Sequence, residues 1–320
     1  MKSWDLTTLG STMLSLSTEP GASLLSSQRM RLGIAGAESN CAIALARLGT
    51  RVSWHSKIAR NGLSERVVSE IRSHGVDVSS VLWTESGRQE QMWVEAGLGS
   101  NHTNVIYDRT GAAIDSLKTE EIVMEDLLDT TFFHATGITP ALSEDCRDTV
   151  FETVRLARKA GVRVSFDVNY RAKLWEPARA REVLSKIIEG VDLLFVGAGD
   201  LAIIWERGGE PRDDLAWLQD RFGITNVVLT QGGKGASGLL GDSFHRSGAF
   251  QGEVVSPIGA GDAFAAGVVH ALLGGNDEEA LRHGCAMAAL ARESRDDYVL
   301  GGLKGLEARM DTEGVKKLSR

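Results

Sequence analysis

A glycine-rich turn, Gly259-Ala260-Gly261-Asp262, carries the clearest chemistry in the sequence. It opens into an apolar stretch predicted to be helical from about Asp262 to Leu273, and its glycines let the backbone approach a ligand closely. N–H groups and the dipole at a helix start favour a bound anion. An ionised carboxylate beside that anion hole can take the proton from an attacking alcohol. The turn therefore predicts phosphoryl transfer, although a plain helix cap explains the same four residues.

Other secondary-structure elements must position this turn. After about residue 120, predicted strands alternate with predicted helices. Strands are predicted at 132–135, 162–167, 192–196 and 226–230, with helices at 146–160, 178–189 and 215–222. A further helix is predicted at 280–291. Such alternation is typical of parallel strands joined by crossover helices, and predicts a three-layer α/β sandwich. Ligands bind at the carboxyl ends of such strands, so residues that directly follow a strand are the first candidates.

The first 115 residues follow a different pattern. A strand is predicted at 5–9, then irregular Ser- and Thr-rich sequence to about Gly33, a helix at 40–48, a strand at 52–54 and a helix at 65–74. Short strands at 81–83, 91–96 and 104–107 are separated by turn residues. We expect these segments to add a small β-sheet to a single domain spanning 1–320.

Composition excludes several classes of function. The net charge of −8 at pH 7 disfavours a nucleic-acid surface. No apolar run is long enough to span a membrane and no signal peptide is recognisable, so we expect a cytoplasmic protein. The three cysteines form no CxxC pair and the seven histidines show no metal-ligand spacing, so we expect neither a zinc site nor disulfides. The sequence also contains no GxxxxGK[ST] loop.

Four motifs, in order, resemble those of the PfkB carbohydrate kinases. The stretch at 259–267, GAGDAFAAG, resembles the family signature in which this aspartate is the base. Residues 34–40 and the following AIALARLG are similar to its Gly-Gly…Asn signature, with Ala35 in place of the first glycine. Residues 74–77 resemble its GVD element and 228–236 its TxGxxG segment. The resemblance covers about residues 5–298 and implies a Rossmann-like, ribokinase-like domain with ATP and Mg²⁺ as cofactors.

The resemblance also implies roles for individual residues. Asp262 is expected to be the catalytic base, with Gly259, Ala260 and Gly261 forming the anion hole. The sugar site is expected to include Gly36 and Asn40. The nucleotide is expected to be bordered by Asn169, Thr230, Gly232 and Gly235. A β lid is expected from segments within about 10–40 and 86–115.

Two arginines narrow the substrate class. Residues 167–175, DVNYRAKLW, resemble the DxNYRxxLW segment of 2-keto-3-deoxygluconate kinases and, more loosely, that of fructokinases. Tyr107-Asp108-Arg109 resembles the Tyr-x-Arg of the same kinases. Arg109 and Arg171 suit a carboxylate, because a guanidinium can bind it with two parallel hydrogen bonds. Tyr107 and both arginines are thus expected to hold a sugar acid, with Asp297 contributing from the C-terminal side; surface ion pairs are the alternative for the arginines.

Some positions depart from the family pattern. The usual Asn-x-x-Glu after the strand at 192–196 reads Gly197-Ala198-Gly199-Asp200, and Asp200 is expected to reach the metal only through a water. The same stretch imitates a dinucleotide fingerprint but lacks its acidic partner. Ser256-Pro257-Ile258 replaces Asp-Thr-Thr, so potassium activation is not expected. A neutral sugar kinase and a catalytically weakened sugar-binding relative remain as alternatives.

We also expect a homo-oligomer. Apolar residues on the predicted lid strands, Trp93, Val94, Val105 and Ile106, are candidates for pairing between subunits, because uncovered strand edges tend to associate.

Overall fold

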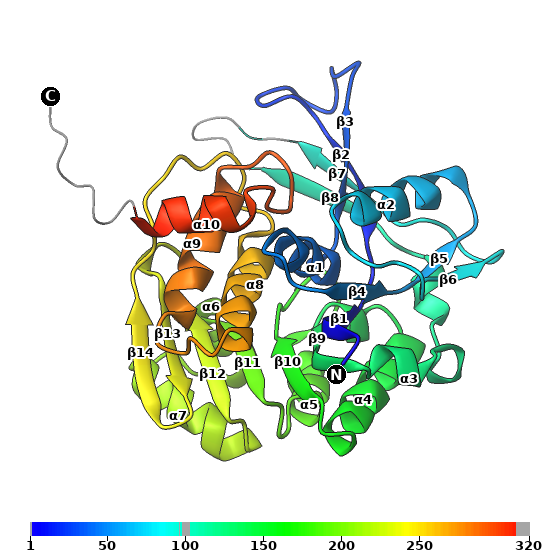
Figure 1. The fold of residues 1–320 in the computed structure, drawn as a ribbon. Helices are drawn as coiled ribbons and strands as arrows, with labels where there is room; N and C mark the ends of the chain where they lie inside the picture. The colour runs from blue at the N-terminus through cyan, green and yellow to red at the C-terminus, as the bar shows by residue number, and fades with distance from the viewer. Residues whose placement is uncertain (1, 96, 98–102, 312–320) are drawn as a thin grey trace, which may run out of the picture.

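A mainly parallel sheet forms the middle layer of the structure, a computed structural model that describes residues 2–95, 97 and 103–311 (Figure 1). Its strands lie in the order β14-β13-β12-β11-β10-β9-β1-β4. Neighbours from β12 to β4 pair in parallel, whereas β13 pairs antiparallel with both β12 and β14. The bounds are β1 (Trp4–Leu9), β4 (Val52–His55), β9 (Thr130–Thr136), β10 (Arg163–Asp167), β11 (Leu193–Gly197), β12 (Asn226–Thr230), β13 (Ala236–Leu240) and β14 (Ser243–Ser247).

Both faces of this sheet are buried. In β11, Leu193 and Phe195 belong to one hydrophobic cluster, whereas Leu194 and Val196 belong to another. Successive side chains of a strand point to opposite faces, so a continuous apolar run requires helices on both sides. The predicted three-layer α/β sandwich is confirmed.

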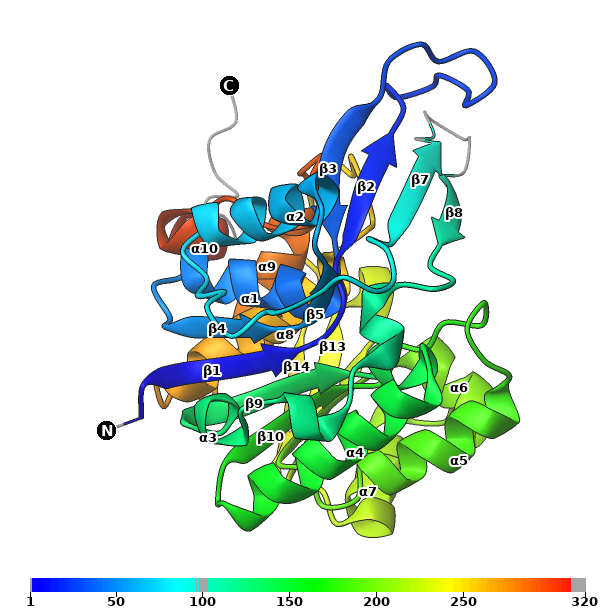
Figure 2. The same cartoon turned by 90° about the vertical axis from the view of Figure 1, so that its right-hand side faces the viewer.

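The helices form the two outer layers (Figures 1 and 2). One layer contains α1 (Ala37–Arg47), α2 (Gly62–Ser73), α8 (Ala260–Leu273), α9 (Ala280–Arg292) and α10 (Gly302–Asp311). The other contains α4 (Glu144–Lys159), α5 (Pro177–Ile187), α6 (Ala198–Trp205) and α7 (Pro211–Phe222). The short α3 (Met124–Leu127) precedes β9. Of these, α3, α6 and α10 are absent from the sequence-based prediction.

A smaller sheet stands away from this body (Figure 2). Its order is β3-β2-β7-β8, with bounds β2 (Met13–Ser17), β3 (Arg31–Ala35), β7 (Gln91–Glu95) and β8 (Asn104–Asp108). The prediction of irregular sequence up to Gly33 is wrong, because β2 and the start of β3 lie there. Serines alternate with apolar residues in β2, and its strand state depends on pairing with β3 and β7. We call this the small sheet.

Two details of the small sheet bear on the predicted oligomer. Val94 is buried and packs near Met13, Ala35 and Met92, so its side chain is not available for pairing between subunits. Ile106 on β8 is 50% exposed. Residue 96, the last of one predicted strand, lies outside the described residues. A further two-stranded ladder pairs β5 (Lys57–Ala59) with β6 (Leu82–Thr84).

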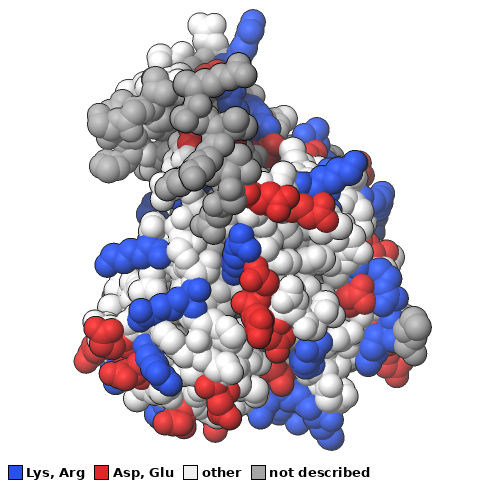
Figure 3. All heavy atoms as spheres, turned by 60° about the vertical axis from the view of Figure 1, so that its left-hand side comes forward, with Lys and Arg blue, Asp and Glu red and all other residues white. Residues whose placement is uncertain are grey.

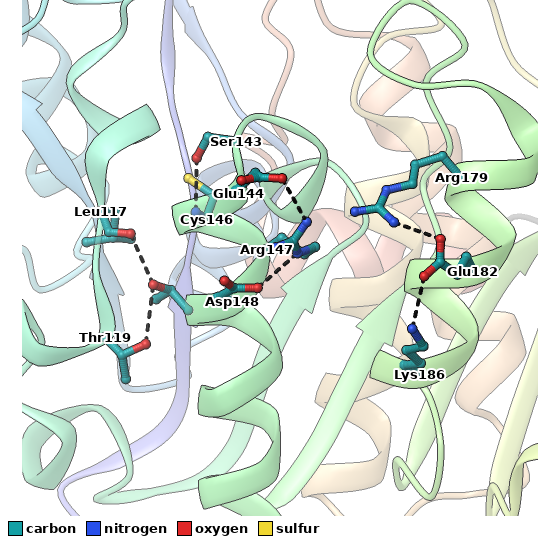
Figure 4. Close-up of polar contacts among 11 residues, drawn as sticks. Leu117, Thr119, Ser143, Glu144, Cys146, Arg147, Asp148, Arg179, Glu182 and Lys186 are labelled. Carbon is teal, nitrogen blue, oxygen red and sulfur yellow. Dashed lines mark hydrogen bonds and ion pairs between the residues drawn. The ribbon is translucent and has the colours of Figure 1, made fainter.

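Local hydrogen bonds define where α4 begins (Figure 4). The Ser143 hydroxyl accepts the Cys146 N–H at 3.0 Å and so caps the helix. Arg147 pairs with Glu144 and Asp148 on the same helix surface. The two acids are exposed, and surface ion pairs of this kind contribute only about 0.2–1 kcal/mol.

Acidic and basic side chains are interspersed over the face shown in Figure 3. Within the described residues, no helix is long and apolar enough to cross a membrane. Cys41, Cys146 and Cys285 are free and buried.

Candidate functional site

A cleft with a volume of about 360 Å³ lies at the carboxyl ends of β10, β11 and β12, beneath the small sheet. This is where an α/β sheet of this kind binds ligands, because the helix N-termini converge there. Most of the predicted site residues line it: Gly36, Asn40, Tyr107, Arg109, Asn169, Arg171, Asp200, Thr230, Gly259, Gly261 and Asp262. They come from both halves of the chain and from both sheets.

The turn before α8 is built around Gly259. Its φ of 78° is left-handed, and a Cβ on it would lie 1.8 Å from the backbone oxygen of Asp297. Only glycine fits both conditions. Ala263 donates its N–H to the Gly259 carbonyl at 2.9 Å, and the N–H groups before it have no acceptor inside the helix. The helix begins at Ala260, two residues earlier than predicted, so its first turn faces the cleft with free donors.

Asp262 is buried, 8% exposed, and hydrogen-bonded. Asn40 donates from Nδ2 to Asp262 Oδ2 at 2.8 Å, and Asn169 donates from Nδ2 to Oδ1 at 3.4 Å. Burial raises the pKa of Asp262, while the Asn40 hydrogen bond, the charge of Arg171 and the Asn169 hydrogen bond lower it. Two amide donors that favour the ionised carboxylate thus oppose the effect of desolvation.

Asp167, at the end of β10, is a cleft residue that sequence reasoning did not select. Its carboxylate accepts the Asn169 N–H at 3.1 Å, and Asn169 adopts a left-handed φ of 39° there. Desolvation, followed by the charges of Asp262 and Asp200, raises the pKa of Asp167 to about 8. Neighbouring carboxylates cannot all ionise easily, so a proton retained on Asp167 favours the ionised form of Asp262.

The two arginines lie on the side of the cleft closest to β8. Arg109 stacks over the Tyr107 ring, with its Cζ 5.1 Å from the ring centroid. Its nearest acid is the buried Glu90, so the alternative of a surface ion pair does not describe it. Arg171 forms no ion pair with any described acid, and its Nη1 donates to the Tyr170 carbonyl at 3.1 Å. Both guanidinium groups are therefore placed to meet an anion in the cleft.

Asp200 lies in the first turn of α6, which begins directly after β11. Its Oδ2 accepts the Tyr170 N–H at 3.2 Å, and desolvation raises its pKa. Among the described residues, no group of three or more Asp, Glu, His or Cys is arranged to hold a metal. The remaining oxygen of Asp200 and the carboxylate of Asp262 are the kind of ligand that Mg²⁺ takes, with waters completing its shell.

The remaining predicted residues lie around the cleft rather than in its wall. Gly232 and Gly235 sit in the β12–β13 loop with φ values of 58° and 94°. A Cβ on Gly235 would lie 2.0 Å from the Ser247 carbonyl, so this glycine has a packing role. Ala260 is the first residue of α8 and does not line the cleft. Asp297 lines a neighbouring cavity and meets the cleft only through the contact of its backbone with Gly259.

Two buried acids also lie behind the cleft without having been predicted. Glu38 in α1 accepts hydrogen bonds from the Thr136 and Thr139 hydroxyls, both at 2.8 Å. Glu90 lies beneath Arg109. Both are more than nine-tenths buried. The sequence shows only that each of these positions is acidic. It does not show that either side chain is buried.

Comparison with known proteins shows which family the chain resembles over most of its length. The family described as pfkB family carbohydrate kinase matches residues 5–299. A 2-dehydro-3-deoxygalactonokinase of Haloferax volcanii is 37% identical, covering 92% of this chain and 93% of its own. A 2-dehydro-3-deoxygluconokinase of Bacillus subtilis is 31% identical, with 83% and 82% covered. The crystal structure of 2-dehydro-3-deoxygluconokinase from Thermotoga maritima superimposes with a TM-score of 0.91 at 25% identity, with 96% and 99% covered.

Proposed function

The chain belongs to the PfkB family of carbohydrate kinases, and we propose that its substrate is a 2-keto-3-deoxy sugar acid such as 2-keto-3-deoxygluconate, phosphorylated by ATP at the 6-hydroxyl. One observation carries the choice of substrate. Arg109 and Arg171 line one side of the cleft, while Asp262 and the start of α8 line another. A neutral sugar needs no pair of guanidinium groups, whereas a carboxylate is bound well by them.

The proposed chemistry follows from the residues around Asp262. Its carboxylate, held by Asn40 and Asn169, takes the proton of the attacking hydroxyl. The backbone N–H groups at the start of α8, which lines the cleft at Gly261 and Asp262, donate to the phosphoryl group as it is transferred. Asp200 would hold Mg²⁺ through a water, and Mg²⁺ bound there would offset the negative charge of the phosphates. Thr230 borders the nucleotide at the end of β12.

The relatives support the acid class without separating its members, because one is named for the galactonate and another for the gluconate. An ADP-release assay over both 2-keto-3-deoxy acids, fructose, ribose and glucose tests the proposal. We expect kcat/KM to be highest for one of the two acids. Faster turnover of fructose or ribose than of either acid would reject the substrate class.

The kinetics of Arg109→Ala distinguish a sugar-acid kinase from the alternative, a neutral-sugar kinase. Loss of a charged hydrogen bond to a carboxylate is worth about 1.5–3 kcal/mol, so KM for the acid should rise by roughly 10- to 150-fold. Use of a neutral sugar should change little. Arg66→Ala serves as the control, since Arg66 is 48% exposed on α2 and forms an ion pair with Glu70 away from the cleft. The other alternative is a catalytically weakened relative that only binds sugars. It would be supported if calorimetry showed binding of a sugar acid while no substrate of the panel was turned over.

A further inference from the structure

Glu90 and Arg109 face each other at the end of the β7–β8 ladder. The last ladder pair is Gln91 with Asp108, and the next residue of each strand brings Glu90 opposite Arg109. Glu90 Oε2 lies 3.8 Å from Arg109 Nε, and the two side chains are 4% and 14% exposed. Opposite-charge pairs across an antiparallel ladder stabilise each other, here at the cleft-facing end of the small sheet.

No hydrogen bond joins Glu90 to Arg109 in the described structure. A separation of 3.8 Å is too long for one. Glu90 Oε2, Arg109 Nε and Arg109 Nη1 are all buried and have no hydrogen-bond partner in the described structure. Leaving a buried charged group without a partner costs at least about 1–3 kcal/mol, so an arrangement of this kind requires an explanation.

An aromatic ring and several polar or charged groups lie around the Glu90–Arg109 pair. The Tyr107 ring stacks against the guanidinium. Arg88 and Asp115 are the other charged groups near Glu90, and Ser11, itself a cleft residue, donates a hydrogen bond to it. Burial raises the pKa of Glu90, whereas the charge of Arg109 and the Ser11 hydrogen bond lower it. Arg109 lines the cleft, while its Nε and Nη1 are buried and Nε lies on the side of Glu90.

We propose that Glu90 is a positioning residue for recognition of the substrate carboxylate. Its charge holds the buried side of the Arg109 guanidinium and so fixes how this group is presented to the cleft. Fixing the side chain in advance lowers the entropy lost when a carboxylate binds. This inference rests on the proposed sugar-acid function and adds to it the residue that sets the arginine in place.

Steady-state kinetics of Glu90→Gln tests the proposal, because glutamine keeps the shape and removes the charge. We expect KM for the sugar acid to rise at least tenfold, while kcat and KM for ATP stay within twofold. A residue with a merely structural role would change all three or none. An unchanged or lowered KM for the acid overturns the proposal.

Asp214→Asn is the matched control. Asp214 is likewise a buried acid, 3% exposed at its side chain, beside an arginine Nε at 2.9 Å, but it lies on α7 away from the cleft. We expect its KM for the acid to equal that of the wild type even if the melting temperature falls. A rise equal to that of Glu90→Gln would attribute the effect to general destabilisation and overturn the proposal.

A double-mutant cycle supplies a second readout. If Glu90 acts through Arg109, then Glu90→Gln adds no further rise in KM to Arg109→Ala. Additive rises contradict the inference. If Glu90→Gln does not fold, Glu90→Asp takes its place: a several-fold rise in KM at unchanged kcat supports the proposal, and an unchanged KM overturns it. A wild type that phosphorylates no sugar acid overturns the proposed function as well, so the two failures are distinguishable.

Discussion

Asn40 on α1 donates a 2.8 Å hydrogen bond to Asp262 on α8, which joins two segments 222 residues apart in the chain. The two segments that resemble PfkB signatures, one containing Asn40 and one containing Asp262, therefore meet at Asp262 Oδ2. Because an amide donor stabilises the ionised carboxylate, the two helices together set the protonation state of the proposed base.

Asn40→Ala should move the acidic limb of kcat/KM to higher pH. The limb reports the ionisation of the free enzyme's base, and removal of the Asn40 hydrogen bond raises the pKa of Asp262 further above its usual range. Activity is lost as pH falls through this pKa, so the variant should lose it sooner. A pH–rate profile from pH 4 to 8 measures the midpoint, with the exposed Asn276→Ala as control. Identical midpoints in wild type and Asn40→Ala would contradict the assignment.

Asp262→Asn should lower kcat by about 10²- to 10⁴-fold, because an amide cannot accept the hydroxyl proton. Affinity for ATP should persist, since the turn that begins α8 does not depend on this carboxylate. Single-turnover kinetics and calorimetry with ATP separate the two quantities. Near-normal turnover would reject Asp262 as the base.

Asp200→Asn should raise the Mg²⁺ concentration needed for half-maximal activity by about tenfold, as is typical for residues that act on a metal from its outer shell. The amide oxygen still accepts the Tyr170 N–H, so the loop should keep its position. Titration of activity with Mg²⁺ is the measurement, and Asp220→Asn, exposed on α7, is the control. An unchanged Mg²⁺ dependence would exclude Asp200 from the metal site.

Glu38→Gln should flatten the pH dependence of stability. Burial raises the pKa of Glu38 to about 7 from 4.5, so between these values the unfolded chain releases a proton that the folded protein retains. The free energy of unfolding therefore falls as pH rises through this window, by roughly 3 kcal/mol for this group. Glutamine keeps the acceptor for Thr136 and Thr139 and removes the titration.

Urea unfolding without ligand at pH 4.5, 5.5 and 7 tests this prediction. Relative to wild type, Glu38→Gln should gain stability as pH rises. The raised pKa values of Asp167 and Asp297 act equally in both proteins, so the difference isolates Glu38. Parallel curves for the two proteins would show that Glu38 does not titrate in this range.

Gly10→Ala should destabilise the fold by about 1–3 kcal/mol, because an added Cβ would lie 2.2 Å from Glu38 Cδ. Glu38 is held by two hydroxyl groups and cannot withdraw freely. Gly62→Ala at the start of α2 is the matched control: no atom lies within 4 Å of its Cβ, and we expect a neutral or stabilising effect there. Equal unfolding midpoints for the two variants would contradict the close packing of Gly10 on Glu38.

Much of the fold is predictable from local sequence. Apolar runs such as the one in β11 must be buried on both faces, and glycine stops such as Gly49 and Gly161 end helices, because both effects act within a few residues. By contrast, the local pattern did not predict β2 and β3, although the family resemblance implied a β lid from segments within about 10–40. Their polar content is tolerated only because neighbouring strands satisfy the backbone, and the identity of those neighbours is not a local property.

The sequence by itself determined the turn from Gly259 to Asp262, since a glycine-rich helix start forms its anion hole from adjacent residues. It also determined which side chains supply charge, with Arg109 and Arg171 on one side and Asp262 on the other. Only the tertiary structure decided which residues hold these groups, with Asn40 hydrogen-bonded to Asp262 and Glu90 beside Arg109. It also decided the burial that raises the pKa of Asp167 to about 8. Partners distant in the chain and the extent of desolvation set those relationships, and neither is encoded in the spacing of a motif.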